Sequence, residues 1–134
     1  MNNFQKYFDE LKDFCKKNNI NKNLICITSS AVLAVLNIRD CNDLDLFINK
    51  KYKDIFKKSI FDIHNKYTKE GHYSHHFNDI INNSNYHFIY DGFKFCNLEL
   101  ILEMKKFRIK NKLFGDNSIN KDKNDIELIK KYKL

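Results

Sequence analysis

The spacing of hydrophobic residues predicts short helices and strands that alternate along the chain. Over residues 3–17, bulky apolar side chains recur every three or four positions, which indicates an amphipathic helix. Leu24–Thr28 is a short apolar run that fits a buried strand. Ala31–Leu36 is apolar throughout and is predicted to form a helix capped by Ser29 or Ser30.

The middle of the chain is predicted to contain a strand, a long helix and a second strand. Residues 43–46 alternate between polar and apolar side chains and are followed by Phe47 and Ile48, which predicts a strand over residues 43–48. Lys50–Tyr67 carries its apolar residues on one helical face, so a long helix is expected there. His75–Ile81 is then predicted to be another strand.

A hairpin and two helices are expected in the last third. Tyr86–Tyr90 and Phe93–Cys96 are predicted strands, and the Asp91-Gly92 pair between them favours the commonest two-residue turn. A helix is predicted to begin near Leu98 and to become basic.

The order of these elements predicts an α/β (α+β) fold in which helices flank a mixed β-sheet. Residues 111–119 are expected to form a loop before a basic helix over residues 120–132. With 134 residues, the chain is predicted to be a single domain whose core spans about residues 20–110.

Composition limits the cellular setting. No apolar run approaches the roughly 20 residues of a membrane-spanning helix, and the N-terminus has no signal-peptide pattern. The four cysteines are scattered without a paired motif, so they are expected to be buried, reduced thiols. These features predict a cytoplasmic protein.

Positive charge is concentrated near the C-terminus. The formal net charge is +7, and residues 104–134 contain ten Lys/Arg against four Asp/Glu. Such a surplus favours phosphate-bearing partners, either a nucleotide or a nucleic acid. The alternative is compositional, because a chain rich in Lys, Asn and Ile is what an AT-rich genome encodes without any functional requirement.

Two carboxylates stand two residues apart in an apolar run. If Asp43 and Asp45 share a strand, their side chains point to the same face, where like charges repel and are costly to desolvate. A hard divalent cation such as Mg²⁺ would offset that repulsion. The alternative is a solvated face of an edge strand.

The turn before these two aspartates contains groups that can bind a phosphate. Thr28, Ser29 and Ser30 place hydroxyls and backbone N–H groups at the start of a predicted helix. A phosphate-binding turn beside a metal-binding carboxylate pair is what phosphoryl or nucleotidyl transfer requires.

This order of motifs resembles the polymerase-beta-type nucleotidyltransferase superfamily, including its small bacterial members. Ile27–Leu33 is similar to the family's Gly-Ser turn and helix, and Asn42–Phe47 is similar to its Asp-x-Asp strand. Lys121–Ile126 resembles a C-terminal Lys-Asp-x-x-Asp-hydrophobic segment. One position departs from the pattern, because Thr28 aligns with the family glycine and Ser29 with its serine.

The resemblance implies the fold, the cofactor and the site residues. Asp43 and Asp45 would hold Mg²⁺ or Mn²⁺, and a third carboxylate on a neighbouring strand would serve as general base. Asp79 is the preferred candidate for that acid, and Glu99 is the alternative. Thr28, Ser29 and Ser30 would contact the nucleotide. Phosphate contacts are also expected from Arg39 and Lys105, for which a solvated surface position is the alternative.

The expected function is transfer of a nucleoside monophosphate from a nucleoside triphosphate to an acceptor hydroxyl. The acceptor, whether a small molecule, a protein or an RNA, is left open. Two other classes remain: an inactive, nucleotidyltransferase-like binding or regulatory module, and a basic nucleic-acid-binding domain.

Overall fold

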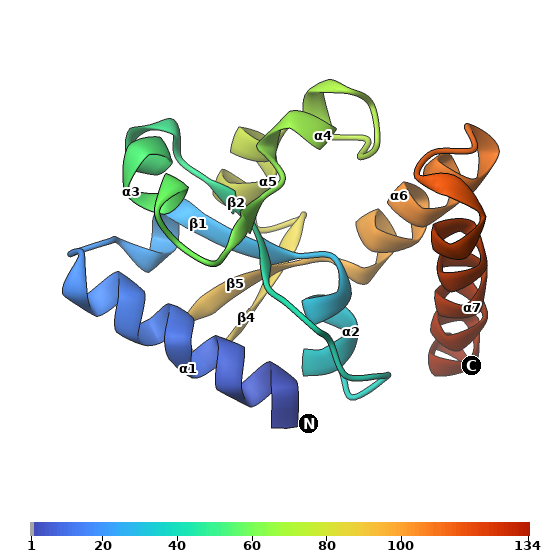
Figure 1. The fold of residues 1–134 in the computed structure, drawn as a ribbon, viewed down its shortest axis with the longest axis horizontal. Helices are drawn as coiled ribbons and strands as arrows, with labels where there is room; N and C mark the ends of the chain where they lie inside the picture. Colours follow the sequence, from blue (N-terminus) through green and yellow to red (C-terminus); the bar gives the residue numbers. More distant parts are fainter. Residues whose placement is uncertain (1) are drawn as a thin grey trace.

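The computed structural model describes residues 2–134 of the chain. It contains a five-stranded mixed sheet and seven α-helices, so the predicted α+β class is confirmed (Figure 1). The elements are α1 (Asn2–Lys17), the 3₁₀ turn η1 (Lys22–Leu24), β1 (Ile25–Thr28), α2 (Ser30–Val35), β2 (Asp45–Ile48), the 3₁₀ turn η2 (Lys50–Tyr52), α3 (Lys53–Lys57), β3 (Asp62–Ile63), α4 (Asn65–Lys69), α5 (Phe77–Asn82), β4 (His87–Tyr90), β5 (Phe93–Cys96), α6 (Leu98–Lys110) and α7 (Gly115–Lys133).

The strands are ordered β3-β2-β1-β5-β4. β1 runs antiparallel to β2 and parallel to β5, while the edge strand β3 runs parallel to β2. β4 and β5 form the predicted hairpin, in which Asp91 and Gly92 adopt φ values of 49° and 78°. Two positive φ values at the tip are those of the type I′ turn that the Asp-Gly pair favours.

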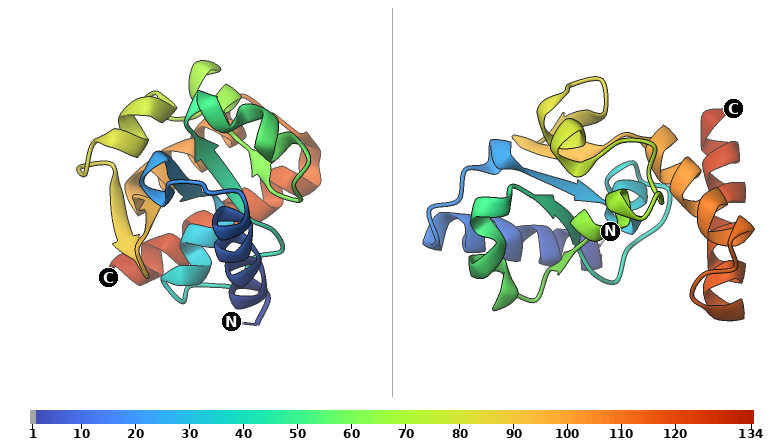
Figure 2. Two further views of the ribbon diagram at one scale, coloured as in Figure 1. Left: turned by 90° about the vertical axis from the view of Figure 1, so that its left-hand side faces the viewer. Right: turned by 90° about the horizontal axis from the view of Figure 1, so that it is seen from above.

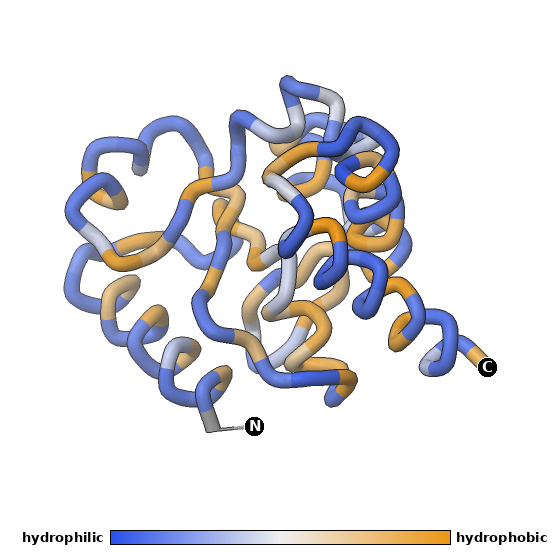
Figure 3. The backbone as a smooth tube through the Cα atoms, turned by 45° about the vertical axis from the view of Figure 1, so that its right-hand side comes forward, coloured by the Kyte–Doolittle hydropathy of each residue, from blue (hydrophilic) through white to orange (hydrophobic). Residues whose placement is uncertain are grey.

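Helices cover both faces of the sheet. In Figures 1 and 2, α1 and α2 lie on one side, α4 and α5 lie on the other, and α6 and α7 pack together at one end. Hydrophobic residues follow the central strands and the inward helix faces, as Figure 3 shows. Phe8, Phe47 and Phe95 are among the fully buried side chains of this core.

No helix within residues 2–134 is long and apolar enough to cross a membrane. All four cysteines are free and buried, as predicted.

The long helix predicted for Lys50–Tyr67 is wrong. The segment instead forms η2, α3, the strand β3 and the start of α4. Helix α3 stops where the Ser59 hydroxyl donates to the Phe56 carbonyl at 2.7 Å and accepts the Phe61 N–H at 3.2 Å. A serine side chain that bonds local backbone groups competes with the helical hydrogen bonds, and the chain then extends into β3.

The strand predicted for His75–Ile81 is also wrong, because this segment contains α5. The His76 side chain caps the helix by accepting the Asn78 N–H. Phe77, Ile80 and Ile81 are buried at helical spacing. Similarly, the loop expected over residues 111–119 is shorter, since α7 begins at Gly115.

A side chain extends the pairing at the edge of the sheet. The Asn65 amide oxygen accepts the Ile48 N–H at 3.0 Å, and its nitrogen donates to the Ile48 carbonyl at 2.9 Å. This pair of bonds resembles the exchange between two backbone residues in a sheet. Asn65 therefore ties the start of α4 to β2 directly after the two-residue strand β3.

Candidate metal centre and adjoining pocket

Three neighbouring strands align polar residues in one row. The register pairs Thr28 on β1 with Asp45 on β2, and Asp45 with Asp62 on β3. Side chains in one row of a sheet point to the same face, and His64 follows two residues after Asp62. The sheet therefore brings two carboxylates and one imidazole together on that face.

The Asp45, Asp62 and His64 side chains meet at short distances. His64 Nε2 lies 3.2 Å from Asp62 Oδ2 and 3.5 Å from Asp45 Oδ1. One ligand atom from each residue lies within 4.8 Å of the other two. Asp45 and His64 are nearly buried, whereas the Asp62 side chain is 68% exposed. The group is thus closed on the protein side and open to solvent at Asp62.

Burial changes the protonation of Asp45. Burial is the largest cause, and the nearby charges of Asp43 and Asp62 add to it, so that the pKa of Asp45 rises from 3.8 to about 7. A hydrogen bond from Ser29 and the charge of Arg108 oppose this rise. The carboxylate is therefore costly to ionise unless a cation is present.

His64 does not supply that positive charge. Burial is the main cause that lowers the pKa of His64 below 6.5, although the carboxylates of Asp62 and Asp43 oppose it. A neutral imidazole has a nitrogen lone pair and is a common metal ligand.

Of the two aspartates predicted to share a strand, only Asp45 lies on β2. Asp43 lies just before β2 in an exposed bend, so it does not share the strand with Asp45. Its charge still raises the pKa of Asp45 and opposes the lowering of the pKa of His64. Asp43 therefore lies at the rim of the centre, while Asp62 is the partner beside Asp45.

This donor set can hold a metal ion. Carboxylate oxygens suit Mg²⁺ and Mn²⁺, and an imidazole nitrogen favours transition-metal ions. The raised pKa of Asp45 fits the same assignment, because a bound cation would favour the ionised carboxylate.

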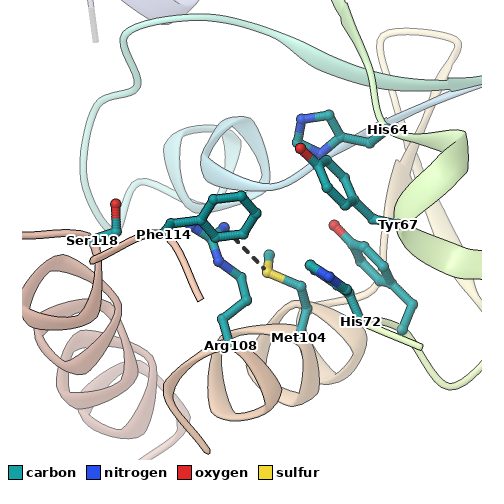
Figure 4. A pocket seen from close by; sticks show the side chains of 8 residues that line it. His64, Tyr67, His72, Met104, Arg108, Phe114 and Ser118 are labelled. Atoms are coloured by element: carbon teal, nitrogen blue, oxygen red, sulfur yellow. Dashed lines mark hydrogen bonds between the residues drawn. The ribbon is translucent and has the colours of Figure 1, made fainter. Parts of the chain in front are cut away.

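A pocket of about 230 Å³ adjoins the metal centre. It is lined by His64, Tyr67, His72, Tyr73, Met104, Arg108, Phe114 and Ser118. Figure 4 shows His64 and Tyr67 entering from the β3–α4 side, and Arg108 and Phe114 from the α6–α7 side. His64 belongs to both the pocket and the metal centre, so the two are continuous.

Arg108 is the cation of this pocket, and its hydrogen-bonding capacity is largely free. Its Nη1 donates to the Met104 sulfur at 3.7 Å, a weak bond. Its Nε lies 3.3 Å from Asp122 Oδ2, but among the described residues it has no partner in hydrogen-bond geometry. A guanidinium has five N–H donors, so Arg108 can still bind an anion.

The serine turn lies next to Asp45, but its strained residue is not Thr28. Thr28 ends β1 with its hydroxyl 3.0 Å from the Tyr73 hydroxyl in the core. Ser29 instead adopts φ 62° and ψ −139°, a conformation that favours glycine. The structure therefore places the glycine-like position at Ser29, and Ser30 is the first residue of α2.

Neither predicted third carboxylate lies in the metal centre. Asp79 is exposed in the first turn of α5, since its predicted strand is a helix. Glu99 lies in the first turn of α6 and pairs with Lys133. The carboxylate on the strand beside Asp45 is that of Asp62.

Arg39 and Lys105 belong to a buried ion network. Two Arg39 nitrogens contact Asp125, at 2.6 and 2.8 Å. Lys105 Nζ lies 2.9 Å from Asp125 Oδ2 and 3.3 Å from Asp122 Oδ1. Although burial opposes it, pairing with Arg39 and Lys105 holds the pKa of Asp125 below its usual value. These two cations join α7 to the rest of the domain, and contact with a nucleotide stays a prediction for both.

Asp62 and His64 are the functional candidates that the sequence patterns did not select, whereas Arg108 was considered for phosphate contact together with Lys105, with a solvated face as the alternative. Asp62-Ile63-His64 does alternate polar and apolar side chains, but the apolar residues around it also fitted a helix. Their role comes from pairing between distant segments, which periodicity does not report.

Comparisons of the chain with protein-family models, with curated proteins and with solved structures gave no match.

Proposed function

We propose that the protein is a metal-dependent nucleotidyltransferase of the polymerase-beta type. The observation that carries the proposal is the continuity of the Asp45–Asp62–His64 group with a pocket that contains Arg108. Such a site offers carboxylates for a cation and a guanidinium for phosphates. The order of turn, helix and acidic strand in the sequence supports the same function.

Asp45, Asp62 and His64 would hold Mg²⁺ or Mn²⁺, with Asp43 adding negative charge at the rim. The ion, when bound, would offset the charge that develops on the triphosphate during transfer. Arg108 would bind phosphate oxygens through its free N–H donors, as guanidinium groups do in phosphate sites. Ser29, whose hydroxyl faces Asp45, would contact the phosphates at the turn.

The reaction forms a bond between the acceptor oxygen and the α-phosphorus, and breaks the bond from that phosphorus to the bridging oxygen. Pyrophosphate leaves, and the acceptor hydroxyl gives up a proton. Asp62 is suited to take that proton, because its carboxylate is mostly exposed and lies beside the centre. It takes the place that the resemblance assigned to a third carboxylate.

Calorimetric titration with each nucleoside triphosphate, in Mg²⁺ or Mn²⁺, tests the proposal. We expect binding of at least one triphosphate, and its loss in Asp45→Asn. Absence of binding at millimolar ligand by folded wild-type protein would refute it. An inactive binding module would bind the triphosphate but release no pyrophosphate with any acceptor tested.

A second candidate function, nucleic-acid binding, is favoured by a separate lysine-lined groove. This groove of about 510 Å³ is bordered by Lys50, Lys53, Lys57, Lys66 and Lys69, and no carboxylate from the described part of the chain lines it. Several lysines around one groove favour a polyanion. Filter binding with single-stranded RNA at several salt concentrations tests this function: affinity that falls steeply with salt supports it, and salt-independent or absent binding excludes it.

A further inference from the structure

Phe114 contradicts the local rules at its position. It precedes α7 as the N-cap residue, makes no side-chain capping bond, and has left-handed backbone angles of φ 66° and ψ 14°. Its side chain is a large hydrophobic group, yet the residue is 54% exposed. Asparagine would satisfy all three demands of this position, because it tolerates a positive φ, can cap a helix with its side chain and is polar.

The ring of Phe114 faces the pocket. It lies 4.7 Å from the Arg108 guanidinium carbon, measured to the ring centroid. Its centroid is 6.1 Å from those of Tyr67 and His72, and the Tyr67 ring is nearly perpendicular to it, at 87°. Tyr67 in turn lies 4.8 Å from His64. A row of rings therefore leads from Phe114 to the metal centre (Figure 4).

The size of the pocket limits what it can receive. Drug-sized ligands occupy pockets of roughly 300–1,000 Å³. About 230 Å³ is too small for a whole nucleotide, but it suits one planar ring system whose attached groups extend out of the pocket. Aromatic side chains stack on the faces of nucleobases.

We propose that the ring of Phe114, positioned by the Arg108 guanidinium that lies over it, forms the wall against which the base of the nucleoside triphosphate stacks, so that the N–H donors of Arg108 remain for the phosphates. The base lies in the pocket against this ring, and the sugar and phosphates extend past His64 toward Asp45 and Asp62. The inference rests on the proposed function, and it explains why a phenylalanine occupies a position suited to asparagine. Stacking of this kind accepts any base face, so binding by all four triphosphates is expected.

The test compares two ligands on three variants by calorimetry in Mn²⁺. Inorganic tripolyphosphate probes the metal centre and Arg108 alone, and ATP adds the sugar and base. Phe114→Asn removes the ring and fits the backbone. Phe114→Tyr keeps the ring. Lys112→Asn is the matched control, because Lys112 has φ 51° in the same junction but does not line the pocket.

We expect wild-type protein to bind ATP more tightly than tripolyphosphate. Phe114→Asn should weaken ATP binding at least about fivefold, the lower end of what stacking on an aromatic side chain contributes. Its tripolyphosphate affinity and its melting temperature should not fall. Phe114→Tyr and Lys112→Asn should bind ATP like wild type.

Four results would overturn the inference. Unchanged ATP binding in Phe114→Asn would show that the ring does not contact the base. Equal weakening of both ligands would assign Phe114 a structural role in placing Arg108. Tripolyphosphate binding with no gain from ATP would reject the base site while leaving the proposed function intact. Absence of binding by either ligand would reject both.

Discussion

Replacing Asp45 by asparagine should stabilise the metal-free protein at neutral pH. The folded protein keeps Asp45 protonated up to about pH 7, whereas a carboxyl with the ordinary pKa of 3.8 has lost its proton well below that. Between pH 3.8 and pH 7 the folded state binds more protons than the unfolded state. The free energy of unfolding of the wild type therefore falls as the pH rises, and this fall is complete above pH 7. The difference between the two pKa values corresponds to roughly 4 kcal/mol of unfolding free energy.

Asparagine has the shape of aspartate and carries no charge at any pH. We expect Asp45→Asn to raise the free energy of unfolding by roughly 2–3 kcal/mol at pH 8, less than the full difference because its bond to Ser29 is altered. Near pH 4 the gain should vanish, since both side chains are then neutral in the fold. Urea unfolding with a chelator, followed by circular dichroism from pH 4 to pH 8, measures this curve.

Two further measurements decide whether the reasoning holds. Asp54→Asn changes a carboxylate that is 94% exposed, so its stability should stay within about 0.5 kcal/mol of wild type at every pH. Millimolar Mn²⁺ should stabilise wild type more at pH 8 than at pH 5, and should not stabilise Asp45→Asn. A stability difference between Asp45→Asn and wild type that does not change with pH would refute the burial argument.

Substitutions at three other positions test the site and its support. Ser29→Gly should raise stability by about 1 kcal/mol by relieving the positive φ, whereas Ser29→Ala should not; equal effects in thermal unfolding would contradict the assigned strain. Lys105→Met should lower stability by about 3–5 kcal/mol, because it leaves Asp122 and Asp125 short of positive charge; a loss below about 1 kcal/mol in urea would be inconsistent with a buried network. His64→Gln should weaken Mn²⁺ binding more than Mg²⁺ binding, and equal weakening by calorimetry would mean that the imidazole only positions Asp62.

Local patterns were sufficient where neighbours in sequence are also neighbours in space. The β4–β5 hairpin was predicted because its turn residues and both strands are contiguous. The strand that carries Asp45 was predicted from alternation. In each case one short segment contains the full signal.

The rest of the site depends on pairing that no local pattern reports. β3 has two residues, too few to show a period of two, and its parallel pairing with β2 requires a long connection. Asp62 and His64 were therefore placed on a helix. Asp79 was preferred from the order of elements and because Glu99 also suited the first turn of a helix, and the capping by His76 at the start of α5 was not recognised.

The hydrogen bonds of the Asn65 amide determine which insertions and deletions the domain tolerates. β3 is too short to fix its own alignment, and a shift of one residue would turn Ile63 toward the carboxylate of Asp45 and turn Asp62 away. Asn65 makes hydrogen bonds to both backbone groups of Ile48, and so fixes the alignment of β3 against β2 from outside the metal centre. Insertions between Lys57 and Phe61 should therefore be accommodated, whereas a single residue added or removed between Asp62 and Asn65 should dismantle the metal centre while leaving most of the core intact.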